Sequence, residues 1–577
     1  MTFTKYYEDE IAYLRDLGAA FGRANPAIAG MLSKQASDPD VERLLEGFAF
    51  LTGRLRQRLD EELPELSHGL LTLLWPHFLR PVPALSILEF IPASGTVSTI
   101  PRGSVVAAAP VEGVSCRFRT CVDAVVVPAK VSAVHLEERA YSATLVVQIA
   151  ALGGAPVGLA LTRRLRLFLH GETDPRLGMR LLRTLLTDVV RVEATDGKRV
   201  VELPPSALTQ AGLGLDDGVL PWPANSAPGH QLLQEYMTFP ARFLFVDLPP
   251  LAPLGPFAGN ALTLSFHMER KPDLPARLAP EHFRLNCTPI INLYADESQA
   301  ISPDPGRIEH RLVPAGRGGG HARVYAVESV YGHVQGQAER IIYHPFESLR
   351  HVLPGGAGTF YRTRMRPAVL GAGCDMWISF VNGMDRQTVP AAAVISVTLT
   401  CTNGAVAELI PVGGINRVAS GSSASLAFRN ITSVTAEIPP PLGGDTLWRL
   451  VSGLACGLRA LGDVGVLRAL LATYDFRAAH DDPERHRLSL MLDALREVKV
   501  EPTHVLIDGI PAHGRHFTLT VNERGFGGIE AVYLFGSVLN AFLACNAEIN
   551  ACHRLTVLGA ETKMAFAWPA RGRQRPA

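Results

Sequence analysis

The sequence predicts an α+β protein of several domains, with a helical N-terminal region, β-rich middle domains and a mixed α/β C-terminal domain. Apolar residues recur at helical spacing near the N-terminus, alternate with polar residues through the middle, and return to helical spacing near the C-terminus. The chain has 577 residues, enough for three or four domains of ordinary size. We place these domains at residues 1–84, 85–275, 276–441 and 442–577.

The composition is typical of a globular protein and gives no sign of nucleic-acid binding. Hydrophobic residues make up 47% of the chain and charged residues 19%, which argues against disorder. Lys plus Arg equals Asp plus Glu, at 55 each, whereas a nucleic-acid-binding protein usually has a basic excess. The eight cysteines form no dense disulfide framework, so we expect free thiols, mostly buried, in a reducing compartment.

Neither a signal peptide nor a membrane insertion is predicted. The first residues lack the basic segment and the apolar segment that together make a secretory signal. The most apolar late stretch, residues 531–545, is shorter than the roughly 18–20 residues that a membrane span needs, so we interpret it as a buried core helix. We therefore expect a cytoplasmic protein.

The N-terminal region is predicted to contain three helices that carry apolar faces. In the first helix this face consists of Tyr7, Ile11, Leu14 and Phe21. Asp38 and Pro39 begin the second, whose face consists of Val41, Leu44, Leu45, Phe48, Leu51 and Leu55. A third segment, residues 65–74, leads into a stiff, extended exit that contains Trp75 and Phe78.

These twelve apolar residues are our candidates for a helical bundle or a protein interface. Three short helices with wide apolar faces need each other or a partner, because each buried large apolar side chain contributes about 1.5–3 kcal/mol. The faces pack together within this chain or complete a bundle with another subunit, and the sequence leaves both open. If Phe48 is buried, its replacement by alanine should cost about 3–5 kcal/mol.

The middle of the chain is predicted to consist mainly of strands. Polar and apolar residues alternate over 164–169 and 262–268, and Asp196-Gly197 and Asn403-Gly404 each predict a hairpin. Asp174 and Pro175 begin a helix. Arg362, Arg364 and Arg366 share one face of a strand, where they bind a phosphate or an acidic partner or, more commonly, protect a strand edge.

The C-terminal region is predicted to mix helices and strands. Asp445, Asp463 and Asp482 each begin a helix, and residues 517–521 alternate as a strand. A last helix is expected from Glu530 to Asn550, followed by a loose tail from Trp568 to Ala577.

No motif for catalysis, a cofactor or a metal is found. The sequence has no Walker A loop, nucleophile elbow, zinc-protease helix or calcium loop. The glycines at residues 212–218 are spaced one residue too widely for a dinucleotide turn and lie among prolines. Cys116 and Cys121 are too far apart for a zinc pair and have no second pair, so we interpret them as buried thiols. The chain is therefore predicted not to be an enzyme.

Several blocks of sequence resemble the TssF family of type VI secretion baseplate subunits, also called ImpG or VasA. The resemblance is strongest in ordered, correctly spaced blocks at residues 6–15, 21–29, 38–51, 63–66 and 76–83. It continues more weakly at residues 116–121, 448–452, 535–539 and 568–569. The segments after Ser452 and Pro483, and residues 545–552, depart from the family's pattern.

The resemblance implies a structural protein in the baseplate of a contractile, phage-tail-like injection machine. It implies that two copies bind one TssG-like subunit in each wedge, with no catalytic activity and no cofactor. Wedges would assemble around the VgrG spike, dock on the membrane complex through a TssK-like subunit and join the sheath with a TssE-like subunit. Two alternatives are a wedge protein of a different contractile injection machine or phage tail, and a β-rich hydrolase whose carboxylates are far apart in sequence.

Overall fold

The chain divides into two compact units, one formed by residues 1–74 with 442–451 and the other by residues 75–441 with 452–577. The computed structural model describes residues 11, 43, 46–52, 54, 69, 71–92, 95–154, 156–172, 174–223, 226–227, 229–251, 257, 259–304, 306–316, 321–334, 336, 340–347, 359–368, 373–383, 386–418, 426–442, 461–507, 510–547 and 551–572. The helix predicted from Asp445, and most of the three predicted N-terminal helices, lie outside these residues.

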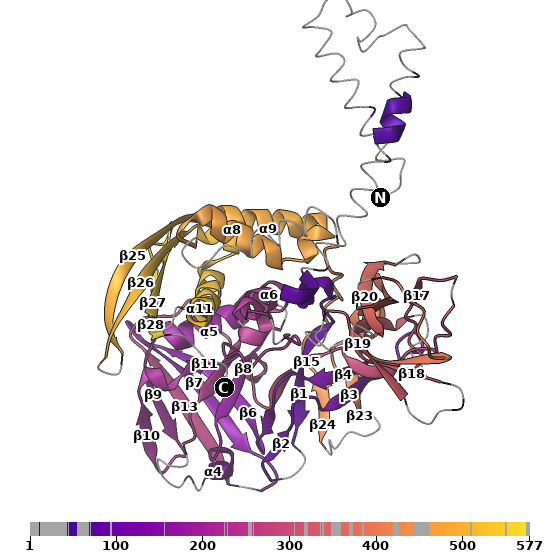
Figure 1. Ribbon diagram of the computed structural model, residues 1–577. Coiled ribbons are helices and arrows are strands. Elements are labelled where there is room, and N and C mark those ends of the chain that lie inside the picture. Colours follow the sequence, from indigo (N-terminus) through magenta and orange to yellow (C-terminus); the bar gives the residue numbers. More distant parts are fainter. Residues whose placement is uncertain are drawn as a thin grey trace, which may run out of the picture. The chain divides into compact units, whose positions relative to one another are not determined.

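A six-stranded sheet begins the larger unit and joins segments that are far apart in sequence (Figure 1). Its order is β23 (Ile415–Val418), β3 (Val105–Ala108), β4 (Arg117–Thr120), β15 (Cys287–Ile291), β1 (Leu85–Ile91) and β24 (Ala427–Asn430). β1 pairs with β15 on one side and with β24 on the other. The strand pairing therefore does not follow the domain boundary predicted near residue 275.

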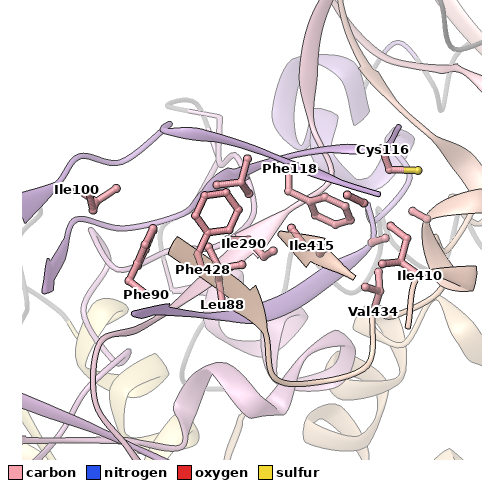
Figure 2. Close-up of a cluster of buried hydrophobic side chains, with 14 of the residues drawn as sticks. Leu88, Phe90, Ile100, Cys116, Phe118, Ile290, Ile410, Ile415, Phe428 and Val434 are labelled. Carbon is pink, nitrogen blue, oxygen red and sulfur yellow. The ribbon is translucent and has the colours of Figure 1, made fainter. Parts of the chain in front are cut away.

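The core of this sheet is apolar and comes from both predicted β-rich domains. Figure 2 shows the rings of Phe90, Phe118 and Phe428 gathered with aliphatic side chains that include Ile290 and Ile415. Phe90 and Phe428 meet edge to face at 6.0 Å between ring centroids. Two short strands from the same part of the sequence, β2 (Ser98–Ile100) and β5 (Ala124–Val126), pair with each other in a separate antiparallel sheet.

A five-stranded antiparallel sheet confirms the predicted alternation and the first predicted hairpin. Its order is β10 (Val200–Leu203), β9 (Val189–Thr195), β13 (Ala261–Met268), β7 (Ala143–Ala151) and β6 (Ala129–Glu138). Alternate residues of β13 are buried, from Leu262 to Met268. Asp196 and Gly197 turn the chain between β9 and β10, and Gly197 has a φ of 86°, which suits glycine.

A small four-stranded sheet adjoins the helices of this region. Its order is β11 (Thr209–Gln210), β12 (Phe245–Leu248), β8 (Leu165–Leu169) and β14 (Phe283–Arg284). The nearby helices are α4 (Val157–Ala160), α5 (Pro175–Thr187) and α6 (His230–Thr238). The predicted start of α5 is confirmed, because the side chain of Asp174 accepts a hydrogen bond from the backbone N–H of Arg176 at 3.0 Å.

A seven-stranded sheet occupies most of residues 294–402. Its order is β16 (Tyr294–Glu297), β22 (Val394–Thr402), β18 (Arg323–His333), β19 (Arg340–Pro345), β20 (Thr359–Pro367), β21 (Cys374–Asn382) and β17 (Glu309–Arg311). The strand that carries the three predicted arginines is β20, which lies between β19 and β21. β19 pairs with β20 only at Phe360 and Tyr361, so within the described residues Arg362, Arg364 and Arg366 lie where β20 pairs with β21 alone, in agreement with the predicted strand edge.

The second predicted hairpin is wrong. After β22 the chain enters a 3₁₀ helix, η9 (Gly404–Leu409), instead of a tight turn. The side chain of Asn403 is the reason, because its Oδ1 accepts a hydrogen bond from Nδ2 of Asn292 at 2.8 Å and another from the N–H of Arg117 at 3.2 Å. Asn403 is buried and committed to these contacts.

The C-terminal region packs helices against a four-stranded sheet (Figure 1). The strands are β25 (Leu495–Ile507), β26 (Ile510–Val521), β27 (Ala551–Gly559) and β28 (Ala565–Gly572). The helices are α8 (Val464–Tyr474), α9 (Asp482–Ala494), α10 (Glu523–Phe526) and α11 (Ile529–Cys545). The helix start predicted at Asp463 is confirmed, since its side chain accepts hydrogen bonds from two backbone N–H groups.

The apolar stretch predicted as a core helix forms α11, in which every residue from Val532 to Cys545 is buried. It ends earlier than predicted. The expected loose tail is wrong at Trp568, which lies in β28 and stacks on Tyr533 of α11 at 5.6 Å between ring centroids. Gly536 permits this contact, because a Cβ there would lie 2.3 Å from the Trp568 ring.

The segment expected to be an extended exit contains a short 3₁₀ helix instead. This is η2 (Pro76–Leu79). Besides η2 and η9, the described residues include the 3₁₀ helices η3 (Pro205–Ala207), η4 (Pro240–Phe243), η6 (Pro280–His282) and η11 (Arg477–Ala479). Phe78 of η2 is fully buried and packs on Tyr474 and Phe476 at 5.4 and 5.7 Å between ring centroids.

Replacing Phe78 by alanine should lower the free energy of unfolding by about 3–5 kcal/mol, because it empties an aromatic site that the surrounding rings cannot close. Chemical denaturation of the purified chain measures this change. The matched control is Tyr141→Ala, since Tyr141 is 89% exposed and its loss should alter stability by about 0.5 kcal/mol or less. Equal effects of the two substitutions would contradict the burial of Phe78.

Candidate interaction surfaces

The described part of the second N-terminal helix turns apolar side chains toward solvent. Residues 46–52 are helical, and within them Phe48 and Leu51 are 58% and 65% exposed while Ala49 is fully buried. Phe48 and Leu51 are three residues apart and so share a face. The helix therefore buries one side and leaves a second, apolar side uncovered. This arrangement is typical of a helix that binds a partner.

The twelve predicted bundle residues differ in burial and in whether the structure describes them. Ile11 is buried, with 9% of its surface exposed. Phe48 is not, so the condition for a 3–5 kcal/mol cost of its truncation is not met. The remaining candidates of the first two helices, Tyr7, Leu14, Phe21, Val41, Leu44, Leu45 and Leu55, lie outside the described residues.

Trp75 and Phe78 belong to the interior of the larger unit instead of a surface. Trp75 is 9% exposed and Phe78 is fully buried. The Trp75 ring lies 5.7 Å from that of Phe78 and 4.9 Å from that of His230. Side chains so enclosed have little surface to offer another subunit, so we assign both to the core.

The same place holds two histidines that sequence reasoning missed, of which His77 is buried and His230 is partly buried. His77 of η2 lies 3.9 Å from the Trp222 ring, and its Nδ1 is 3.3 Å from the hydroxyl of Ser226. The hydroxyl of Tyr474 is hydrogen-bonded to Nδ1 of His230. Tyr474 and His230 are 244 positions apart in the sequence, and no local sequence pattern predicts a hydrogen bond over that separation.

Burial keeps these imidazoles neutral. It lowers the pKa of His230 to about 4. It also lowers the pKa of His77 well below its ordinary value, helped by the nearby His230 and Arg80. In β27, burial likewise lowers the pKa of His553 to about 4, and its Nε2 lies 3.0 Å from the backbone oxygen of Asn540 in α11. Neutral histidines at helix contacts make these contacts sensitive to acid.

The arginines of β20 find partners within this chain. Arg362 lies 3.6 Å from Glu347 and stacks over the ring of Phe346 at 4.3 Å. Arg366 pairs with Glu309 at 2.5 Å. These intramolecular contacts weaken the interpretation of the strand as a phosphate or acidic-partner site.

The cysteines predicted to be buried thiols are confirmed in that role. Cys116 and Cys121 are both buried and free. Burial raises the pKa of Cys116 to about 11 and that of Cys121 to about 12. A thiol must lose its proton to bind a metal, so this environment disfavours metal binding.

The hydrolase alternative would need an acidic pocket, and one cavity of the larger unit is lined by three aspartates. Three arginines line the same cavity, so its charges balance. It has a volume of about 380 Å³, and the charged residues that line it are Asp123, Asp216, Asp217, Arg102, Arg164 and Arg166. The backbone N–H of Arg102 donates to Asp123 at 2.7 Å, and Arg166 binds Asp247 through two hydrogen bonds. A glycosidase-type hydrolase needs one carboxyl held neutral beside one held charged, and this cavity places its three aspartates among three arginines instead of in an apolar environment.

Across the described residues, no helix is both long enough and apolar enough to span a membrane.

Comparison with known proteins gives one consistent result. The family described as "Type VI secretion system, TssF" matches residues 1–575. "Type VI secretion system component TssF1" of Pseudomonas aeruginosa is 28% identical and covers 99% of each chain. A chain of the cryo-electron microscopy structure of the type VI secretion TssK-TssF-TssG baseplate subcomplex is 28% identical, with a TM-score of 0.73, covering 93% of this chain and all of that one. A chain of the type VI baseplate complex gives a TM-score of 0.61 at 28% identity and full coverage of both chains.

Replacing Phe48 by alanine should change the free energy of unfolding by less than about 1 kcal/mol, because an exposed ring leaves little cavity behind. Thermal unfolding of the isolated chain measures this. Leu71→Ala is the control in the same unit, since Leu71 is 1% exposed and its loss should cost about 2–5 kcal/mol. A loss at Phe48 as large as that at Leu71 would show the ring to be part of a core.

Lowering the pH from 7 to 5 should destabilise the folded chain. Unfolded histidine, with a pKa near 6.5, takes up a proton in this range, whereas His230 and His553 resist it down to about pH 4. The unfolded state then binds more protons, and each histidine removes about 2 kcal/mol at pH 5. Denaturant unfolding at both pH values tests this, and His230→Phe should reduce the loss by about 2 kcal/mol. An unchanged pH dependence in that variant would contradict a neutral His230 in the folded chain.

Proposed function

The chain belongs to the TssF family and is a baseplate component of a type VI secretion system, and from that premise we propose that it is a structural scaffold of the baseplate wedge. The observation that carries this proposal is the match over residues 1–575, which leaves almost no part of the chain to a different function. The exposed apolar face of Phe48 and Leu51 supports it, because a scaffold needs surfaces that a partner covers.

We propose that two copies of the chain bind one TssG-like subunit in each wedge. Relatives assemble with TssG and TssK in a solved baseplate subcomplex. An apolar helix face suits a bundle shared among subunits, because helices join by laying such faces together. Burial of Phe48 and Leu51 in a shared bundle would contribute about 1.5–3 kcal/mol for each fully buried side chain.

The further partners in this proposal are a TssK-like subunit that docks the wedge on the membrane complex, a TssE-like subunit that joins it to the sheath, and the VgrG spike. The chain then works in the cytoplasm, at the inner face of the inner membrane. The mechanism is mechanical coupling: the baseplate holds an extended sheath and then rearranges, which requires interfaces with two discrete packings. No catalytic step and no cofactor enter this mechanism.

Co-purification with the cognate TssG-like protein, with the mass of the complex measured by light scattering, tests the scaffold proposal. The expected result is a stable complex that contains two copies of this chain and one of the TssG-like protein. A chain that remains unbound at micromolar concentrations of both proteins would overturn the proposal.

Two variants connect the complex to the exposed face. Phe48→Asp should abolish or strongly weaken the complex, because it places a charge in a desolvated apolar contact. Tyr141→Asp, at an exposed aromatic residue of the larger unit, should leave it intact. Both variants should keep the thermal unfolding midpoint of the wild-type chain when tested alone. A complex that survives Phe48→Asp would keep the scaffold proposal but move the interface elsewhere.

A further inference from the structure

Two histidines face each other across the hairpin formed by β25 and β26. His504 of β25 is paired directly with His513 of β26. Their Nδ1 atoms are 2.7 Å apart, and the ring centroids are separated by 4.7 Å with the planes at 82°. Both side chains are exposed. Two imidazole nitrogens therefore converge on one point that solvent can reach.

Two imidazole nitrogens this close require a proton or a cation between them. An imidazole nitrogen that carries no proton is an acceptor, so two bare Nδ1 atoms repel each other at this distance. Either one ring holds its proton on Nδ1 and donates it to the other, or a cation occupies the space. Neutral imidazole is the common nitrogen ligand of zinc, nickel and copper.

The geometry is close to that of a metal chelate. A zinc–nitrogen bond of about 2.0–2.1 Å and a tetrahedral angle place two nitrogen ligands about 3.3 Å apart. A small rotation of the two rings would widen the observed separation to that value. The strands hold both residues in place, because twelve residue pairs connect β25 to β26 along their length.

We propose that His504 and His513 together bind a divalent transition metal ion, of the class Zn²⁺, Ni²⁺ or Cu²⁺, through their Nδ1 atoms. Both rings would then carry their proton on Nε2. Within the part of the chain that the structure describes, no three metal-ligating side chains meet, so water completes the coordination. Both histidines are exposed, so solvent can supply that water; a cavity of about 190 Å³ is lined by His513 but not by His504.

The neighbouring groups limit the affinity. Arg515 lines the same cavity, and its positive charge opposes a dication. His553 also lines it, but its Nε2 contacts Asn540, so it adds no ligand in this conformation. Two ligands and a nearby cation give weaker binding than the four-ligand sites that hold structural zinc. The bound ion would join the two strands of the hairpin and stabilise their pairing.

Titration calorimetry with Zn²⁺ and with Ni²⁺, on the full chain free of any histidine tag, tests the proposal. The wild-type chain should show one site that His504→Asn and His513→Asn each weaken by at least about tenfold, since either change removes the chelate. His516→Asn is the matched control, because His516 lies on the same strand and contacts Thr556 at 2.9 Å. It should leave the site unchanged.

Two further readouts separate a chelate from scattered surface histidines. The metal should raise the thermal unfolding midpoint of the wild-type chain and of His516→Asn, but not of the two variants at the site. Binding should weaken as the pH falls from 7.5 to 5.5, because protons compete for the imidazoles. Equal affinities in all four proteins, or no binding at millimolar metal, would overturn the proposal and leave a proton shared between the rings.

Discussion

The burial of the Phe78 ring connects the beginning of the larger unit to its C-terminal helices. Among the described residues this ring comes before every strand, whereas its neighbours Tyr474 and Phe476 come after the large β-rich segment. His230 of α6 joins the same cluster through Tyr474 and through Phe542 of α11. Four segments that are distant in sequence, η2, α6, α8 with η11, and α11, therefore meet around a few rings.

A buried ion pair stabilises the loop beside this cluster. Glu235 of α6 and Arg242 of η4 form an ion pair in which both side chains are almost wholly buried. Glu235 also accepts hydrogen bonds from the backbone N–H groups of Val219 and Leu220, both at 2.8 Å. Arg242 donates to the backbone oxygen of Gly212. A buried charge is tolerated when it is paired and hydrogen-bonded, and here the pair also fixes a proline-rich loop that has little secondary structure.

Local chemistry explains which parts of the fold could be predicted from the sequence. The cap at Asp174, the turn at Asp196-Gly197, the alternation of β13 and the apolar run of α11 each depend on neighbouring residues, and each is present. The partners of β1 could not be predicted, since Pro289 opposite Ile87 is some 200 residues away and the hydrogen-bonding backbone carries no sequence signal.

The predicted hairpin at Asn403-Gly404 and the predicted loose tail at Trp568 are wrong for the same reason, which is a side-chain contact with another part of the chain. The residues Asn403-Gly404 are typical of a hairpin turn, but the side chain of Asn403 is buried and accepts a hydrogen bond from the amide of Asn292. Trp568 lies in a segment with tail-like composition, yet the space above Gly536 holds its ring. For the candidate surface, helical spacing predicted that Phe48 and Leu51 share one face, and both lie in the helical residues 46–52. Helical spacing does not predict whether an apolar face is buried, because burial depends on which other segment or subunit packs against that face.

The charge balance and the exposed helix face together constrain how the scaffold would recognise its partners. With 55 basic and 55 acidic residues, the chain has no net charge to steer a partner from a distance. Specific association then depends on short-range contact, and the exposed apolar face formed by Phe48 and Leu51 offers that contact. Such contacts form best where several subunits are already held close together. On the proposed function, assembly in the wedge provides that proximity, so the N-terminal unit can remain partly uncovered until its partners arrive while the larger unit is stabilised by its own core.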